Sequence, residues 1–195
     1  TNSNNYAVDT LRPTATIVVA DNALKAGETS LVTITFSEAV TGFDNSDLTI
    51  ANGSLTAVGS NDGGITWTAT LTPTVSIEDT TNLISLNNTG VADAAGNAGS
   101  GTTDSNNYDV DTLRPTVGIT LSDSALGIGE TATVTFTFSE AVNGFDNTDI
   151  TIPNGTLSAV SSGDGGITWT ATLTPNPATT DSTNILTVNN TGYLD

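Results

Sequence analysis

Histidine, cysteine and methionine are absent from the 195-residue sequence, and only 3 residues are Lys or Arg. Without His or Cys the chain cannot build a Ser-His-Asp triad, a cysteine nucleophile, a zinc finger, a haem histidine or an iron–sulfur cluster. Three cations cannot neutralise a phosphate backbone, so no nucleic-acid partner is expected. No apolar run approaches the length needed to cross a bilayer, so no membrane span is expected.

Negative charges far outnumber positive ones, but charged residues of either sign are a small fraction of the chain. The 21 Asp and Glu residues give a formal net charge of −18, yet charged residues make up only 12% of the chain. Most of the rest is Thr, Ser, Asn, Gly and aliphatic residues. Acidic disordered segments are poor in β-branched residues, whereas this chain is rich in them. The carboxylates therefore belong to a folded, β-rich protein.

An internal repeat with an offset of 102 residues runs through the sequence without a gap. Leu11–Thr14 recurs as Leu113–Thr116, and Gly63–Thr70 recurs unchanged as Gly165–Thr172. Solenoid repeats have periods of about 20–50 residues, so a period of this length indicates tandem whole domains.

Each period contains short alternating segments and no apolar pattern of helical period. In the first period the expected strands are residues 14–19, 30–36, 47–50, 54–58, 65–72, 82–87 and 106–111. Asn52-Gly53 predicts a short hairpin between the third and fourth of them. This pattern predicts an all-β fold class, with two tandem immunoglobulin-like β-sandwich modules and an extra N-terminal strand.

The aromatic residues are few and fall at positions typical of a core. Trp67 and its counterpart Trp169 lie in the most regular alternating segment. We expect Trp67 to be a core residue, with Ile65 and Ala69 on the same face of the strand.

The module boundaries follow from the repeat. Residues 1–9 match the segment 103–111 that closes the first module, so they are interpreted as the last strand of an upstream module or as an exchanged strand. Module 1 then spans residues 10–111, and module 2 spans residues 112–195 and lacks its last strand. That strand comes either in cis, from adjacent copies of the module, or from a neighbouring chain by strand exchange. Both alternatives stay open.

Five motifs resemble bacterial immunoglobulin-like repeats of giant secreted surface proteins, namely biofilm-associated proteins and repeats-in-toxin adhesins. They are Asp9–Thr14, Phe36–Val40, Gly42–Asp44, Asp62–Trp67 and Asp93–Asn97. The resemblance implies non-catalytic modules of an adhesin stalk or surface filament, secreted or displayed on the bacterial cell surface. It also implies calcium ions that stiffen the module junctions.

The strand order gathers acidic residues at one end of each module, because successive strands reverse direction. The candidate metal ligands are Asp9, Glu38, Asp44, Asp93, Asp109, Asp111, Glu140, Asp146 and Asp195. Two unit charges about 5 Å apart repel by roughly 3 kcal/mol at an effective dielectric near 20, so clustered acids favour a bound cation. Oxygen ligands without any soft ligand select calcium.

Several of these acids also fit a purely structural role. Asp62 in Asp62-Gly63-Gly64 is typical of a turn, and Asp44 and Asp146 could cap turns as well as bind metal. No EF-hand loop is present.

Two other functions compete with the structural one. A module that itself binds a carbohydrate or protein would carry exposed aromatic residues, but aromatic residues make up only 5% of the chain. A glycosidase with paired carboxylates would need an active site duplicated in both repeats, so no enzyme is expected.

Overall fold

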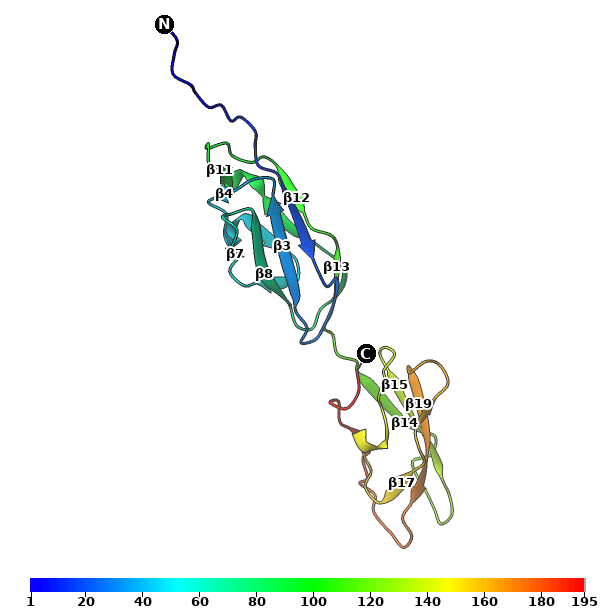
Figure 1. The fold of residues 1–195 in the computed structure, drawn as a ribbon. Coiled ribbons are helices and arrows are strands. Elements are labelled where there is room, and N and C mark those ends of the chain that lie inside the picture. The colour runs from blue at the N-terminus through cyan, green and yellow to red at the C-terminus, as the bar shows by residue number, and fades with distance from the viewer. Residues whose placement is uncertain (195) are drawn as a thin grey trace. The chain divides into compact units, whose positions relative to one another are not determined.

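The computed structural model describes residues 1–194, and the chain divides into two units after Leu113. Unit 1 begins at Thr1 and unit 2 begins at Arg114 (Figure 1). Strands dominate both units, and the helices are short 3-10 turns. Among residues 1–194, no helix is long and apolar enough to cross a membrane.

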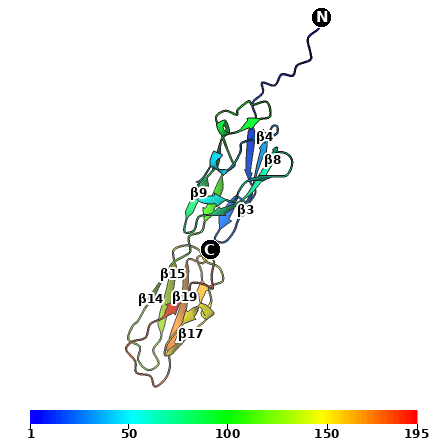
Figure 2. The same ribbon diagram turned by 90° about the vertical axis from the view of Figure 1, so that its left-hand side faces the viewer.

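The largest sheet of unit 1 has the order β1-β3-β8-β6, with β7 also paired to β8. Its strands are β1 (Ala15–Val19), β3 (Ser30–Phe36), β6 (Gly53–Leu55), β7 (Gly59–Ser60) and β8 (Thr66–Pro73). Figure 2 labels its central strands β3 and β8. Alternate residues of β3 are buried, which is the pattern of a strand with one face on a core.

The other strands of unit 1 form three small sheets with the orders β12-β10-β5, β2-β13-β9 and β11-β4. They are β2 (Ala23–Lys25), β4 (Val40–Thr41), β5 (Leu48–Ile50), β9 (Glu78–Asn82), β10 (Ile84–Asn87), β11 (Ala92–Asp93), β12 (Thr102–Asp104) and β13 (Tyr108–Asp111). The 3-10 turns are η1 (Asn45–Asp47) and η2 (Asn88–Gly90). One buried cluster joins the large sheet to β5, β10 and β13, so unit 1 is a two-layer sandwich.

Strand β13 closes the core of unit 1. It pairs in parallel with β2 and antiparallel with β9. The Tyr108 side chain is fully buried, and its hydroxyl donates a hydrogen bond to the Ala51 carbonyl. Burial and the negative charge of Asp79 raise the pKa of Tyr108 to about 12.

Unit 2 repeats the large sheet, in the order β14-β15-β19-β17 with β18 on β19, and adds the pair β16-β20. Its elements are β14 (Val117–Leu121), β15 (Ala132–Phe138), η3 (Asn147–Asp149), β16 (Ile150–Thr151), β17 (Gly155–Leu157), β18 (Ser161–Ser162), β19 (Thr168–Pro175) and β20 (Thr187–Val188). Residues 125–127 and 180–184, the counterparts of β2 and β9, form no strand. Between them, within the described part of unit 2, no strand takes the place of β13.

The prediction of a hairpin at Asn52-Gly53 is wrong, because the strands on either side of the turn do not pair with each other. Asn52 has the positive φ of 45° that such a turn needs. However, β5 pairs with β10 and β6 pairs with β8, so the turn joins two sheets instead of two neighbouring strands. Asn52 is held there because its amide donates hydrogen bonds to the Asp79 and Asn82 side chains.

The placement of Trp67 in the core is confirmed in part. Trp67 and the buried Ala69 lie on one face of β8, and the Trp67 ring packs edge-on against Phe43 at 5.2 Å. The indole is only partly buried, and its N–H donates to the Gly64 carbonyl. Ile65 precedes β8 and is 40% exposed, so the prediction that it shares this buried face is wrong.

The segment Thr1–Asp9 forms no strand within this chain, and all its residues are exposed. Figure 1 shows it in dark blue as an extended chain before β1. A strand here therefore stays a prediction that requires a partner outside unit 1.

Replacing Tyr108 with Ala should lower the free energy of unfolding of unit 1 by about 3–5 kcal/mol, because a fully buried ring leaves a cavity. Denaturant unfolding followed through Trp67, in a Trp169→Phe background, measures the change. Tyr6→Ala is the matched control: Tyr6 is 79% exposed, so in dilute solution the change should stay within about 0.5 kcal/mol. Equal effects of the two substitutions would contradict the assignment of Tyr108 as the closing core residue.

Candidate functional site

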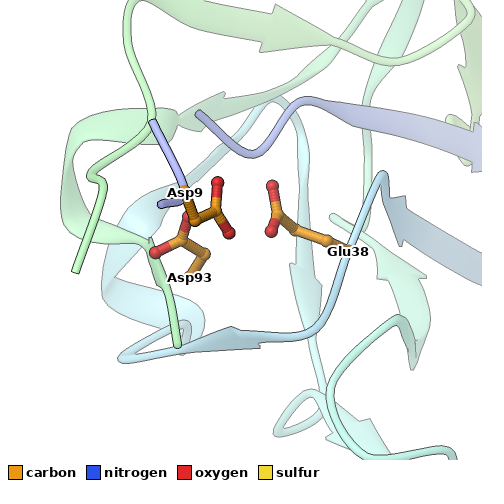
Figure 3. Close-up of side chains that lie close together, drawn as sticks. All are labelled: Asp9, Glu38 and Asp93. Carbon is orange, nitrogen blue, oxygen red and sulfur yellow. The ribbon is translucent and has the colours of Figure 1, made fainter. Parts of the chain in front are cut away.

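Three carboxylates meet at one end of unit 1. Asp9, Glu38 and Asp93 each offer an oxygen, and these oxygens all lie within 4.8 Å of one another. Figure 3 shows the carboxylates of Asp9 and Glu38 facing each other, with that of Asp93 beside Asp9. Asp9 is exposed, Glu38 is half-buried and Asp93 is buried.

Each carboxylate comes from a different part of the fold. Asp9 lies before β1, Glu38 follows the end of β3, and Asp93 ends β11. β1 and β3 are antiparallel neighbours, so the start of one lies beside the end of the other. β11 is brought to the same end because it pairs with β4, just after Glu38.

Asn97 fixes the geometry of two of the three acids. Its backbone N–H and its amide donate to the two oxygens of Asp93, each at 2.8 Å. The same amide donates to the Asp9 carbonyl at 3.2 Å. Arg12 adds a second link, because its guanidinium donates to the Ala98 carbonyl. The segment before β1 is thus hydrogen-bonded to the loop that holds Asp93.

Glu38 and Asp93 differ in how readily they ionise. Loss of hydration raises the pKa of Glu38 above its usual range, and the negative charges of Asp93 and then Asp9 raise it further. The hydrogen bond from the Asn97 side chain lowers the pKa of Asp93, with smaller contributions from backbone N–H groups, against the opposing effect of burial. Asp93 is therefore held ionised next to a Glu38 whose ionisation is disfavoured, an arrangement that a cation would stabilise.

Asp44 and Asp146 lie outside this group, although both were expected ligands. Each caps a 3-10 turn: Asp44 accepts hydrogen bonds from the backbone and hydroxyl of Ser46, and Asp146 does the same with Thr148. The acid three residues later, Asp47 or Asp149, completes a reciprocal capping box. The Asp-x-x-Asp spacing is a sequence pattern that could have predicted this role.

Asp109 and Asp111 are alternate residues of β13 and so share one face of the strand. Asp109 is exposed and accepts a hydrogen bond from the Asn107 amide. The Oδ1 atom of Asp111 is buried and has no hydrogen-bond partner among residues 1–194.

The counterparts of the three clustered acids at the 102-residue offset are Asp111, Glu140 and Asp195. Glu140 is half-buried just after β15, as Glu38 is after β3. Asp195 lies outside the described residues, so its assignment as a ligand stays a prediction.

Asp62 and its counterpart Asp164 hold turns. The Asp62 carboxylate accepts hydrogen bonds from the backbone of Ile65 and Thr66 and from the Ser60 hydroxyl. These bonds, that from the Thr66 backbone first, lower the pKa of Asp62 from its ordinary value of 3.8 to about 2. The carboxylate is thus engaged within its own loop.

Asp62→Asn should remove stability that depends on pH. The folded pKa of Asp62 is lowered, so its ionised form stabilises the fold above its ordinary pKa, and this stabilisation is lost as the pH falls from about 4 to about 2. The free energy of unfolding, measured with denaturant, should be higher for the wild type than for the variant at pH 5. This difference should shrink as the pH falls toward 2. Asp164→Asn, whose carboxyl also has a pKa of about 2, should behave alike. A difference that is constant over this range would contradict the role assigned to the carboxylate.

The sequence and the fold match known proteins as follows. No curated protein matches the sequence. Among solved structures, the adhesin FdeC of Escherichia coli aligns with 14% identity and a TM-score of 0.45, over 93% of this chain and 63% of that one. This chain therefore corresponds to less than two thirds of that solved chain. Residues 9–110 and 111–195 each match the family described as bacterial Ig-like domain. The chain belongs to this family and consists of two bacterial Ig-like domains in tandem.

Proposed function

We propose that the two domains are non-catalytic structural modules of an adhesin stalk or filament on the bacterial surface, and that calcium at Asp9, Glu38 and Asp93 stiffens them. The observation that carries the proposal is that each of these three carboxylates has an oxygen within 4.8 Å of the other two. Membership in the bacterial Ig-like family and the tandem arrangement support the structural role.

The spacing of the oxygens suits a calcium ion. Calcium binds oxygen ligands at about 2.3–2.6 Å, so two oxygens on one ion lie at most about 5 Å apart. The oxygens of the three acids lie within 4.8 Å of one another. Carboxylates are hard ligands, and calcium accepts the irregular geometry of acids drawn from three separate segments.

Calcium at this position would fix the chain that enters unit 1. Asp9 is exposed and lies in the segment before β1, whereas Asp93 is buried in the module. An ion shared by both would attach the entering segment to the body of the module more firmly than the hydrogen bonds of Asn97 and Arg12 do alone. A preceding module in a tandem array would then be held in a defined direction.

The repeat places Asp111, Glu140 and Asp195 at the positions that correspond to Asp9, Glu38 and Asp93, and on this ground each is also proposed as a calcium ligand. The buried Oδ1 of Asp111, unpartnered among residues 1–194, supports the idea that this oxygen binds an ion.

A carbohydrate-binding role has less support. Tyr6 is the only aromatic side chain that is exposed among residues 1–194, and the others are buried or partly buried in the two cores. Sugar-binding surfaces usually present several aromatic rings, so a structural role fits the distribution better.

Calcium should raise the melting temperature of the 195-residue chain, and a chelator should reverse the rise. A site filled at 100 times its dissociation constant adds about 2.7 kcal/mol to the free energy of unfolding. Calorimetric titration with calcium should also detect binding directly. Glu38→Gln should weaken binding in unit 1 by at least tenfold, because it removes one of three carboxylates without changing side-chain size.

Asp21→Asn is the matched control for this experiment. It changes the net charge by the same amount, and the amide oxygen of the new side chain can still accept the hydrogen bond that the Ala23 N–H donates to Asp21. Asp21 follows β1, whereas Asp9 precedes it. Equal losses in both variants would show that calcium only screens the overall negative charge, and an unchanged melting temperature in calcium would refute the proposal.

A further inference from the structure

We infer that the outer face of the large sheet of unit 1, here called the neutral face, is a contact surface for the same face of a second copy of this chain. The neutral face consists of the outward-facing residues of β1, β3, β6, β7 and β8. Unit 2 presents an equivalent face on β14, β15, β17, β18 and β19. The inference concerns association between copies and does not depend on the calcium proposal.

The strands of this sheet carry no charge. The five strands of the large sheet in unit 1 contain no Asp, Glu, Lys or Arg. Their five counterparts in unit 2 contain none either. The second layer of unit 1 differs, because its strands carry Lys25, Glu78, Asp104 and Asp109 at exposed positions. In a chain with a formal net charge of −18, charge is thus confined to one of the two layers of strands in unit 1.

Threonine fills the centre of the neutral face. Thr35 on β3 lies between Thr16 on β1 and Thr66 on β8. One row further along the sheet, Thr33 lies beside Thr68. Threonine is short and β-branched, so a face of this composition has no long side chains that would hold a second sheet away. Two sheets that pack face to face lie about 10 Å apart, and residues of this size allow such an approach.

The two copies of the repeat retain the neutrality of this face even where its residues differ. Val18 and Leu31 correspond to Thr120 and Thr133, and none of the differences on this face introduces a charge. On the second layer, by contrast, Lys25 corresponds to a glycine. The outward threonines that recur as threonine at the 102-residue offset are Thr33, Thr35, Thr66, Thr68, Thr70 and Thr72.

The neutral face is the side on which two acidic chains repel each other least. The charged residues of the second layer lie across a sandwich whose sheets are about 10 Å apart, and the Debye length at physiological ionic strength is about 8 Å. Their repulsion through a contact at the neutral face is therefore largely screened. A contact through the second layer would instead bring the exposed Asp104 and Asp109 of the two copies together.

Two apolar side chains add an attraction in unit 1. Val18 and Leu31 are each 53% exposed on the neutral face. Val18 is the register partner of Thr33, two residues from Leu31, so the two apolar side chains are diagonal neighbours. The face has no aromatic ring for a sugar to stack on, which favours a second copy over a carbohydrate as its partner. Each unit offers one such face, so a tandem chain is multivalent.

Sedimentation equilibrium of the 195-residue chain, in a chelator and up to millimolar concentration, tests the inference. We expect reversible association that strengthens as salt rises from low to physiological concentration, because salt screens the net negative charge. Thr68→Glu combined with Thr170→Glu should raise the dissociation constant at least tenfold, because it places a carboxylate at the centre of each neutral face.

Thr49→Glu combined with Thr151→Glu is the matched control. It adds the same charge at exposed strand positions outside the large sheets, in β5 and β16, and should raise the dissociation constant less than threefold. The melting temperatures of both variants verify that they are folded. A chain that stays monomeric at all salt concentrations, or equal weakening by the two pairs of substitutions, would overturn the inference.

A charge swap distinguishes direct contact between neutral faces from general repulsion. The variant with Thr68→Lys and Thr170→Lys should associate with the variant carrying Thr68→Glu and Thr170→Glu at least tenfold more tightly than either variant associates with itself. No preference in the mixture would overturn the inference. Binding of dextran, a neutral polysaccharide, by a chain that does not associate with itself would assign the face to a carbohydrate and would also overturn it.

Discussion

The closing strand β13 is the constraint on which the sandwich of unit 1 depends. It places Tyr108 and Val110 in the core while its backbone joins β2 to β9. Neither neighbour has the pattern of a strand over more than a few residues: β2 is the three residues Ala-Leu-Lys, and β9 reads Glu-Asp-Thr-Thr-Asn and has no apolar alternation. In unit 2, where the described residues supply no equivalent of β13, the corresponding segments do not form strands. The two segments are regular strands in the unit where β13 pairs with both of them.

The same dependence explains which parts of the fold the sequence predicted. The strands β1, β3 and β8 were expected because each carries an alternating pattern over five or more residues, with one face buried. Strand β9 was missed because its buried residue is polar: Asn82 is fully buried and bonded to Asp79, Asn52 and Tyr108. Hydrophobic periodicity cannot detect a strand whose stability comes from hydrogen bonds to distant residues. The Asn52-Gly53 turn was found for a local reason, its φ preference, but that preference does not specify which strands pair.

The sequence predicted the part of the candidate site that strand order brings together. It did not predict where a carboxylate instead forms hydrogen bonds with residues next to it in the sequence. Asp9, Glu38 and Asp93 are far apart in the sequence, yet counting strand reversals placed them at one end of the module, and the structure brings them together. Asp44 was placed at the same end by that reasoning, but its carboxylate is occupied by Ser46 two residues away. Asn97 appeared in the sequence analysis only as the end of the motif Asp93–Asn97, whereas the structure shows that its amide bridges Asp93 and Asp9.

The closing-strand motif and the carboxylate group lie next to each other in the repeat. Asp9 and Asp111 each end the motif Asn-Tyr-x-Val-Asp, so the residue that follows the core-filling Tyr and Val is the one that offers a carboxylate. In β13 of unit 1 the core-filling residues Tyr108 and Val110 anchor the strand that ends at Asp111. The segment Thr1–Asp9 carries the same motif and ends at Asp9, which belongs to the carboxylate group of unit 1. An ion at this group would therefore bind the last residue of that motif and restrain the segment that enters unit 1.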